Sequence, residues 1–378
     1  MRTLIRDARL FDGEQVIEET DIVIDGTVIA APDNTAADHV VDGAGRTVLP
    51  GLIDAHTHVF DGSLAEALRY GVTTELDMFC LPANLRRQRR LARERDDVAD
   101  IRSAGTLATP PGGHPSQLMT ALDDPDSFGE AIGAFDTIAE VGEAAAFVRR
   151  RIEEGADYLK VIIDDGALHG NRLPVMTAEL AAALVAAGHD AGLQVVAHAL
   201  SHREVVTALD AGVDVLAHVW TDNVAAADEL AARVVEQGVG VVSTLAYFEA
   251  VGSGVEVDRL SDSTFDNAVR VAAALHRAGA TLLAGTDATP FAPKHGAGLQ
   301  RELQLLTTAG LTPLEALTAA TSSNADRFGL TDRGRIAPGH RADLLLVDGD
   351  PTRDIGAVSN LVDVWRRGVP LGEVNVMA

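Results

Sequence analysis

A repeated pattern in the middle of the chain most constrains its fold. Each repeat has an alanine-rich amphipathic stretch, a glycine, and a short run of Val, Leu and Ile that ends on a polar residue. The glycines and the polar residues that follow them are Gly155 and Lys160, Gly192 and His198, Gly212 and His218, and Gly279 and Asp287. Helices that alternate with short apolar strands are typical of βα units, and such units build a parallel sheet.

Eight runs in this region can form strands. They cover residues 52–59, 72–78, 98–107, 157–163, 193–199, 213–219, 239–245 and 280–286. Eight is the strand number of the α/β fold called the (β/α)8 TIM barrel, whose active site lies at the carboxyl ends of the strands. An open doubly wound sheet is the alternative, but no Gly-x-Gly-x-x-Gly loop follows the first strand to favour it. We also expect helices to begin with capping boxes at Ser201 to Glu204 and at Thr312 to Glu315.

Both ends of the chain have the pattern of β structure. Short β-branched runs near the start are separated by Asp-Gly pairs, which favour hairpin turns. Two more strand-like runs, 342–348 and 362–368, follow near the other end. Because neither end is long enough to bury a core by itself, we expect residues 1–51 and 336–378 to form one composite β-sandwich. Residues 52–335 would then form a barrel inserted into it.

The charge of the chain argues against one class of partner. It has 31 Lys and Arg residues against 56 Asp and Glu, a net charge of −25, which would repel a nucleic-acid backbone. No apolar run approaches the ~20 residues of a membrane span, and we find no signal-peptide core. The single cysteine, Cys80, excludes an internal disulfide and a cysteine-rich metal site. We therefore expect a cytoplasmic protein that acts on a small molecule, with a homo-oligomer left open.

Histidines and an aspartate stand at the predicted carboxyl ends of the strands. His56 and His58 are two residues apart, so on a strand both imidazoles project to one face. His198, His218 and Asp287 each end a separate strand. Taken singly, each has a structural explanation, such as a buried histidine bonded to a carbonyl or an aspartate before a loop. At one rim of one barrel, imidazole and carboxylate groups together form the ligand set of zinc and similar divalent ions.

Lysine is rare in this chain, and one of its positions is informative. Of the 31 cationic residues only Lys160 and Lys294 are lysine. Arginine keeps its proton, whereas a lysine amine can be deprotonated or modified. An ammonium group cannot bind a cation, so Lys160 fits a metal site if its amine has captured carbon dioxide to form a carbamate that bridges two metal ions. Chance retention of a lysine at this position is the alternative.

Further motifs accompany these residues: Leu-Pro-Gly-Leu-Ile-Asp-Ala-His-Thr-His at 49–58, Gly-Thr-Asp at 285–287 and Gly-Arg-Ile-Ala-Pro-Gly-His-Arg-Ala-Asp at 334–343. In combination they resemble the amidohydrolase superfamily, and in particular its prolidase-like and imidazolonepropionase-like metal-dependent hydrolases. The resemblance implies two divalent ions, expected to be zinc. The ligands that it implies are His56, His58 and Asp287 for the more buried ion, His198 and His218 for the more exposed ion, and Lys160 as a bridging carbamate.

The resemblance also implies a reaction. A hydroxide held between two divalent ions is a nucleophile at neutral pH. Asp287 would accept its proton and pass it to the leaving nitrogen. His114, in the Gly-Gly-His at 112–114, would polarise the scissile carbonyl, or would be an ordinary loop histidine. We therefore expect a metal-dependent hydrolase that cleaves a C–N amide bond, with a small dipeptide or an N-acyl amino acid as substrate.

Specificity is expected to lie in the loops that follow the strands. The residues proposed to contact substrate, besides His114, are Trp220, Tyr247, Phe248 and Phe291 as an apolar wall, and Arg172, Lys294 and His295 as clamps for an anionic group. Trp220 stands where similar enzymes often have a substrate-binding tyrosine, so packing in the core is its alternative role.

Other functions stay open. A one-metal deaminase would need an acid after the fifth strand, but the nearest one, Glu204, lies in a predicted capping box. A hydrolase of cyclic amides or lactones is compatible with the same metal chemistry. A noncatalytic scaffold is a further alternative, although such chains usually lose the metal ligands that this chain has kept.

Overall fold

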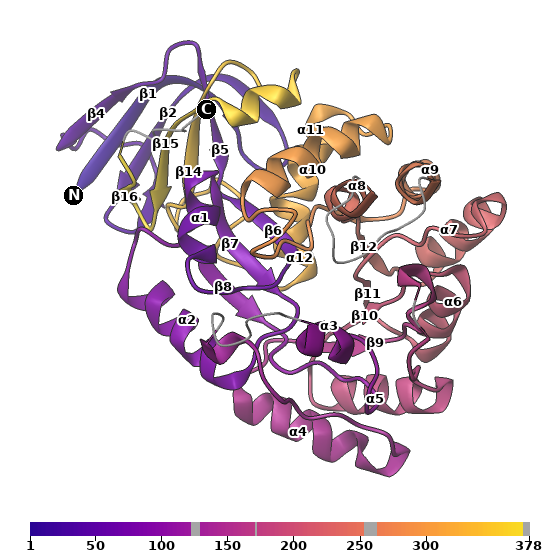
Figure 1. The fold of residues 1–378 in the computed structure, drawn as a ribbon. Helices are drawn as coiled ribbons and strands as arrows, with labels where there is room; N and C mark the ends of the chain where they lie inside the picture. The colour runs from indigo at the N-terminus through magenta and orange to yellow at the C-terminus, as the bar shows by residue number, and fades with distance from the viewer. Residues whose placement is uncertain (122–128, 171, 253–262, 373–378) are drawn as a thin grey trace.

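The computed structural model describes residues 1–121, 129–170, 172–252 and 263–372. Strands and helices alternate through the middle of the chain, and strands gather at both of its ends (Figure 1). Within the described ranges, no helix combines the length and the apolar character that a membrane crossing requires.

Eight short parallel strands lie in the middle of the chain, and each falls inside one of the eight predicted runs. They are β6 (Leu52–Thr57), β7 (Val72–Asp77), β8 (Asp100–Ser103), β9 (Leu159–Ile162), β10 (Val195–His198), β11 (Val215–Leu216), β12 (Gly240–Val242) and β13 (Leu282–Leu283). Hydrogen bonding orders them as a three-stranded sheet, β6-β7-β8, and a five-stranded sheet, β13-β12-β11-β10-β9. The predicted α/β architecture with parallel strands is therefore confirmed.

The edges of these two sheets are connected to each other at both sides. An isolated parallel bridge pairs Thr57, at the end of β6, with Ala288, and another pairs Ala108 with Val161 in β9. Backbone hydrogen bonds accompany both bridges, because the N–H of Asp287 donates to the carbonyl of His56 across 2.8 Å and that of Ala108 donates to Lys160 across 2.8 Å. A closed barrel requires both of these connections.

Side chains from six of the parallel strands, and from residues adjacent to β8 and β9, meet in one buried apolar cluster. Its members are Ile53, Ala55, Leu76, Met78, Ala104, Tyr158, Val196, Val215, Ala217, Val242, Leu283, Ala325 and Leu330. Because successive side chains on a strand point to opposite faces, the same strands contribute their other face to a larger cluster that packs against the helices. The polar residues at the carboxyl ends therefore lie at one end of a shared apolar interior.

The helices follow the strands in the predicted alternation and run along the outside of them (Figure 1). They are α1 (Ser63–Arg69), α2 (Pro82–Glu94), α3 (Ser116–Ala121), α4 (Ala144–Glu154), α5 (Ala178–Asp190), α6 (His202–Ala211), α7 (Ala227–Glu236), α8 (Leu245–Gly252), α9 (Ser263–Ala278), α10 (Ala297–Thr308), α11 (Pro313–Ala319) and α12 (Ser322–Arg327). Both predicted capping boxes are confirmed, at the start of α6 with Ser201 and Glu204 and at the start of α11 with Thr312 and Glu315.

Strands from the two ends of the chain belong to one eight-stranded sheet. They are β1 (Arg2–Phe11), β2 (Val16–Asp25), β3 (Val28–Ala30), β4 (His39–Asp42), β5 (Arg46–Pro50), β14 (Leu344–Asp348), β15 (Leu361–Arg366) and β16 (Val369–Pro370). Their order is β16-β15-β14-β5-β1-β2-β3, with β4 also paired to β1. The first strands, in indigo, therefore lie beside the last strands, in yellow (Figure 1). The domain boundaries themselves stay a prediction.

Hydrogen bonds join the strands of the predicted β-sandwich into one continuous sheet, and β1 connects its two halves. The packing of these halves as a sandwich stays a prediction. The first half of β1 pairs with β4 from Thr3 to Arg6, whereas Arg9 and Leu10 pair with β5. Between the two halves Asp7 has a φ of 54°, and the register with β2 shifts there. Such a bulge bends a strand. One long bent strand thus takes part in both halves of the β structure and connects them by hydrogen bonds.

Candidate active site

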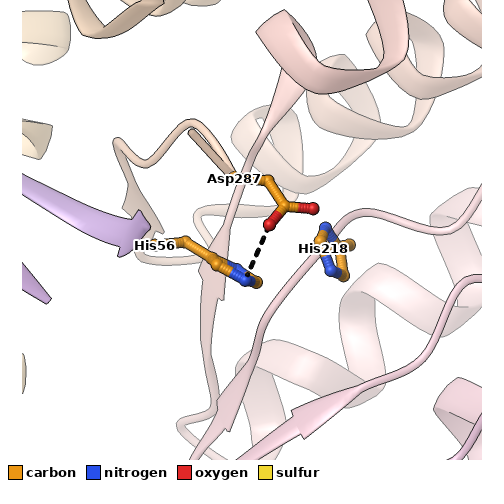
Figure 2. Close-up of side chains that lie close together, drawn as sticks. All are labelled: His56, His218 and Asp287. Atoms are coloured by element: carbon orange, nitrogen blue, oxygen red, sulfur yellow. Dashed lines mark ion pairs between the residues drawn. The ribbon is translucent and has the colours of Figure 1, made fainter. Parts of the chain in front are cut away.

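The predicted ligands come together at the carboxyl ends of the strands. His56 ends β6, His198 ends β10, and His218 follows β11 by two residues. Asp287 follows β13 and is joined to β6 through its backbone. Figure 2 shows the side chains of His56, His218 and Asp287 pointing toward one another. These three residues offer ligand atoms that all lie within 4.8 Å of one another.

Asp287 makes the closest contacts in this group. Its Oδ1 lies 3.2 Å from Nε2 of His56 and 3.0 Å from Nε2 of His58. The residue has a φ of 61°, a left-handed conformation that is uncommon outside glycine. Burial by itself would raise the pKa of the Asp287 carboxyl, but the imidazoles of His56, His58 and His218 hold it well below the ordinary value. Asp287 is therefore a buried carboxylate that stays ionised among imidazoles.

The protonation of His56 follows from its other contact. Its Nδ1 lies 3.0 Å from the carbonyl oxygen of Ala217, and a carbonyl only accepts, so Nδ1 carries the proton. Burial, and next the charge of Lys160, lower the pKa of His56 well below its ordinary value. The ring is then neutral and Nε2 has a lone pair. In this state the lone pair faces the carboxylate oxygen of Asp287, and a cation between these two acceptors would make the arrangement favourable.

Neighbouring groups fix the positions of His56 and Asp287. The carboxylate of Asp54 accepts hydrogen bonds from the backbone N–H groups of His56, across 3.1 Å, and Thr286, across 3.0 Å. The Thr286 hydroxyl also donates to Asp54 across 2.7 Å. Gly285 permits the close approach of this segment to β6, because a Cβ atom there would lie 2.8 Å from the nitrogen of His56. Asp54 was not predicted as part of the site, although it stands inside the motif at 49–58.

His218 and His198 form a second contact within the site. Nε2 of His218 lies 3.0 Å from Nδ1 of His198, and Nδ1 of His218 lies 2.8 Å from the hydroxyl of Thr244. Burial, and next the neighbouring His198 and His56, lower the pKa of His218 well below its ordinary value. The ring of His218 is also close to that of His56, with 4.7 Å between their centroids. His218 therefore links the group around Asp287 to His198.

Lys160 lies on β9 with its side chain buried, at 1% exposure. Its Nζ has no hydrogen-bond partner within the part of the chain that the structure describes. Burial lowers the pKa of Lys160 to about 7, although the carboxylates of Asp287 and Asp77 oppose the shift. A substantial fraction of the amine is then uncharged at neutral pH, and an uncharged amine is the form that reacts with carbon dioxide. The residue thus has the properties that the predicted carbamate requires.

A second group of ligand atoms lies beside the first and includes a residue that was not predicted. Asp164 follows β9 by two residues, and its Oδ2 lies 3.4 Å from Nε2 of His198 and 3.8 Å from Nδ1 of His114. The rings of His114 and His198 stack with 4.9 Å between centroids. Burial raises the pKa of Asp164, but His198 and His114 outweigh it and keep the carboxyl ionised. The only sequence signal for Asp164 was its position as a polar residue directly after a predicted strand.

The residues predicted to contact substrate lie in different environments. The Tyr247 ring lies 6.0 Å from that of His218 and 5.3 Å from that of Phe248, which is fully buried. Trp220 is also fully buried within the large apolar cluster. This burial agrees with the alternative role of Trp220, which is packing in the core. Phe291 is 44% exposed.

The three predicted anion clamps also differ from one another. Arg172 and Lys294 are exposed, and the amine of Lys294 donates to the carbonyl of Pro290. His295 is fully buried, and its Nδ1 lies 2.7 Å from Oε1 of Glu75. Because it is turned inward and paired, His295 does not fit the predicted role of a clamp.

Comparison with known proteins agrees with this geometry. A sequence profile described as the amidohydrolase family matches residues 47–372. The chain belongs to the amidohydrolase family. It is 27% identical over 410 residues to an imidazolonepropionase of Streptomyces griseus subsp. griseus, and the match covers 94% of this chain and 90% of that protein. It is also 28% identical over 363 residues to an adenine deaminase of Gluconobacter oxydans, covering 91% of this chain and 55% of that protein.

Among solved structures of the amidohydrolase fold, a Xaa-Pro dipeptidase with bound methionine in its active site superimposes with a TM-score of 0.81. The two chains are 24% identical, and the match covers 98% of this chain and 99% of that one. At this identity the likeness shows the fold. The family predicted from the motifs is confirmed, together with the predicted similarity to its imidazolonepropionase and prolidase branches.

Proposed function

We propose that this protein is a metal-dependent hydrolase that cleaves a C–N amide bond of a small substrate. The observation that carries the proposal is the contact between His56 and Asp287, where a lone pair and a carboxylate oxygen face each other across 3.2 Å. Bonds of about 2.0–2.2 Å to a tetrahedral zinc ion would separate neighbouring ligand atoms by about 3.3–3.6 Å. The spacing of 3.2 Å lies just below this range, so a small movement of either side chain would let the two atoms share a divalent ion.

The eight parallel strands, in this proposal, form a closed (β/α)8 barrel. The bridges from Thr57 to Ala288 and from Ala108 to Val161 support closure, since they join the two sheets at both edges. The common apolar interior supports it as well. In such a barrel the active site is built on the carboxyl ends of the strands, where the ligands of this chain lie.

Two divalent ions, expected to be zinc, fit the residues present. His56, His58 and Asp287 would hold one ion, His198 and His218 the other, and carbamylated Lys160 would lie between them. The buried amine of Lys160 and the buried Nε2 of His198, both without a hydrogen-bond partner among the described residues, support this assignment. Bound ions would polarise a substrate carbonyl and lower the pKa of water to about 7.

Two side chains of this site carry the proposed proton transfer and orientation. Asp287 has a carboxylate that stays ionised, so it can accept a proton from the attacking water and deliver it to the leaving nitrogen. Its unusual backbone conformation holds the carboxylate between His56 and His58. His114, stacked on His198, would orient the scissile carbonyl from the opposite side.

The substrate proposed is a small dipeptide or an N-acyl amino acid with a free carboxylate. The fold likeness to a Xaa-Pro dipeptidase is compatible with such a substrate. Tyr247 near His218 would supply an apolar wall, and the exposed Arg172 and Lys294 would bind the carboxylate. Trp220 would support this wall from the core.

A one-metal deaminase is the second candidate, because an adenine deaminase is among the relatives and His56, His218 and Asp287 alone offer a site for one ion. Glu204 is not free to serve as the acid that a deaminase would need. Its carboxylate accepts from the backbone N–H groups of Leu200, Ser201 and Asp165, across 3.0, 2.9 and 3.1 Å. This observation favours the hydrolase.

The metal content of the purified protein, combined with product analysis, separates these functions. A hydrolase of the proposed kind would hold about two ions per chain and release an amino acid from an N-acyl substrate. A deaminase would hold about one ion and release ammonia from a purine or a related ring. A chain that binds no divalent ion would be a noncatalytic scaffold, and the proposal would then be wrong.

A further inference from the structure

Thr244 lies between β12 and α8, is fully buried, and contacts one of the proposed metal ligands. Its hydroxyl oxygen lies 2.8 Å from Nδ1 of His218. The other ring nitrogen of His218, Nε2, lies 3.0 Å from Nδ1 of His198. The two nitrogens of His218 therefore have separate partners, and an ion bound to Nε2 would lie on the side of the ring that faces His198.

The backbone of Thr244 has a conformation that is unfavourable for threonine. Its φ is 47°, in the left-handed region, where a β-branched residue is an outlier. Glycine adopts this region freely, so the turn from β12 into α8 would by itself favour glycine at this position. Strained residues of this kind gather at functional sites. The presence of threonine here therefore indicates a use for its side chain.

Hydrogen bonds on both sides of Thr244 hold this strained conformation. The N–H of Thr244 donates to the carbonyl of Gly285 across 3.1 Å. Glu302 holds the flanking residues, because its carboxylate accepts from the hydroxyl of Ser243 and from the N–H of Ala246. The backbone that carries the Thr244 hydroxyl is therefore fixed from both sides.

The arrangement at His218 repeats the one at His56. There, Nδ1 donates to the carbonyl of Ala217 across 3.0 Å, and Nε2 faces Asp287. A hydroxyl oxygen can accept a hydrogen bond as a carbonyl oxygen does. An imidazole that binds a metal generally donates its other N–H to such an acceptor, which selects the tautomer and orients the ring. The partner of His56 is a backbone atom, whereas that of His218 is a side chain that a substitution can remove.

We infer that Thr244 is a positioning residue for the metal centre. It accepts the Nδ1 proton of His218, so that the Nε2 lone pair points toward the ion that His198 and His218 would hold. The inference rests on the proposed function and deepens it, because the motifs that imply the ligands do not include Thr244. In this role Thr244 touches neither the ion nor the substrate, and its loss weakens the binding of one ion.

The zinc affinity of the full-length chain and three variants tests the inference. Thr244→Val keeps the β-branched shape but has no hydroxyl, whereas Thr244→Ser keeps the hydroxyl. Thr321→Val is the matched control, because the buried hydroxyl that it removes donates to a helix carbonyl, that of Leu317, across 2.7 Å. Each protein is stripped with a chelator and titrated with zinc in competition with a chelating dye. Thermal unfolding of the zinc-free proteins measures the stability of the fold separately.

Thr244→Val should raise the dissociation constant of one zinc ion by about 10–100-fold and leave that of the other nearly unchanged. Thr244→Ser and Thr321→Val should bind both ions as the wild type does. If Thr244→Val does not fold, Thr244→Ala takes its place with the same expected loss.

Three results would contradict the inference. Wild-type affinity for both ions in Thr244→Val would overturn it and leave the proposed function intact. Equally weak binding in Thr244→Ser, or in Thr321→Val with a matching loss of zinc-free stability, would assign the effect to packing and overturn it too. Wild-type protein that binds no zinc would overturn the proposed function together with the inference.

Discussion

Nε2 of His56 lies 3.2 Å from Oδ1 of Asp287, and the other nitrogen of His56 donates to a backbone carbonyl. The two residues are far apart in the sequence, but β6 and the segment after β13 are joined by backbone hydrogen bonds. Burial favours a neutral His56 with its single proton on Nδ1, and in that state neither atom of the contact has a proton to give. It is the arrangement expected of two ligands of one cation, and the proposed function depends on it.

Replacement of Asp287 by Asn should separate catalysis from folding. The amide is nearly the same size as the carboxylate but has no negative charge and accepts no proton at neutral pH. We expect a folded protein whose kcat for a hydrolysable amide is lower by about 10³-fold or more. Steady-state kinetics and thermal unfolding of both proteins test this, and unchanged turnover in the variant would exclude Asp287 as the proton acceptor.

Lys160→Ala should lose bound metal together with activity, because the proposed bridging carbamate is removed. Added propionate should restore part of both by filling the space that the side chain leaves. Metal content and kcat are measured with and without propionate, and chloride at equal ionic strength serves as the control. If the variant keeps its metal and its activity without propionate, Lys160 has no part in the site.

Many of the strands, both capping boxes and the family could be predicted from the sequence, because each depends on local pattern. Val195 to His198 forms a strand where an apolar run follows a glycine, and a residue at a strand end is carried to the rim by the fold itself. The hydrogen-bond partner of an imidazole, by contrast, can come from a segment that is distant in the sequence. The carbonyl that fixes the proton of His56 belongs to Ala217, 161 residues away.

Residues of similar type that are adjacent in the sequence can have opposite surroundings. Lys294 is exposed, whereas His295 is fully buried against Glu75, 220 residues away. Asp164 faces two imidazoles, whereas Asp165 faces Arg203. Composition and spacing cannot distinguish such neighbours, because the difference comes from elements that pack against them. The bend at Asp7, on either side of which β1 pairs with β4 and with β5, is equally invisible in the sequence pattern of β1.

The stability of the protein should depend on the titration of Glu302 in α10. Its buried carboxyl accepts hydrogen bonds from the hydroxyl of Ser243 and the N–H of Ala246, at the start of the helix that carries Tyr247. Burial raises its pKa from 4.5 to about 7. The folded state therefore binds this proton more tightly than the unfolded chain, which favours folding at low pH. That stabilisation is complete below about pH 4.5 and is lost as the pH rises to about 7.

Glu302→Gln removes this titration and keeps an acceptor for Ala246. The free energy of unfolding of the wild type, relative to the variant, should fall by on the order of 3 kcal/mol between about pH 4.5 and 7.5. Urea unfolding of both proteins in chelator at several pH values measures the difference. A constant difference across this range would mean that the Glu302 carboxyl titrates alike in the folded and unfolded chains.

The proposed anionic substrate can be tested by comparing each acid with its methyl ester. In a panel of N-acyl amino acids and dipeptides, kcat/KM should be at least about 10-fold higher for the free acids than for their esters. The reason is that a charged pair adds about 1.4 kcal/mol or more to the binding free energy. Lys294→Met or Arg172→Met should reduce the preference mainly through KM. Equal kcat/KM for acid and ester would exclude a carboxylate clamp.

The contact between His56 and Asp287 can be examined directly by anomalous X-ray scattering from crystals grown with zinc. Data collected on either side of the zinc absorption edge show where the ion lies without reference to activity. The account predicts a strong peak about 2.0–2.2 Å from both Nε2 of His56 and Oδ1 of Asp287. Well-ordered side chains with no anomalous peak between them, in crystals saturated with zinc, would contradict it.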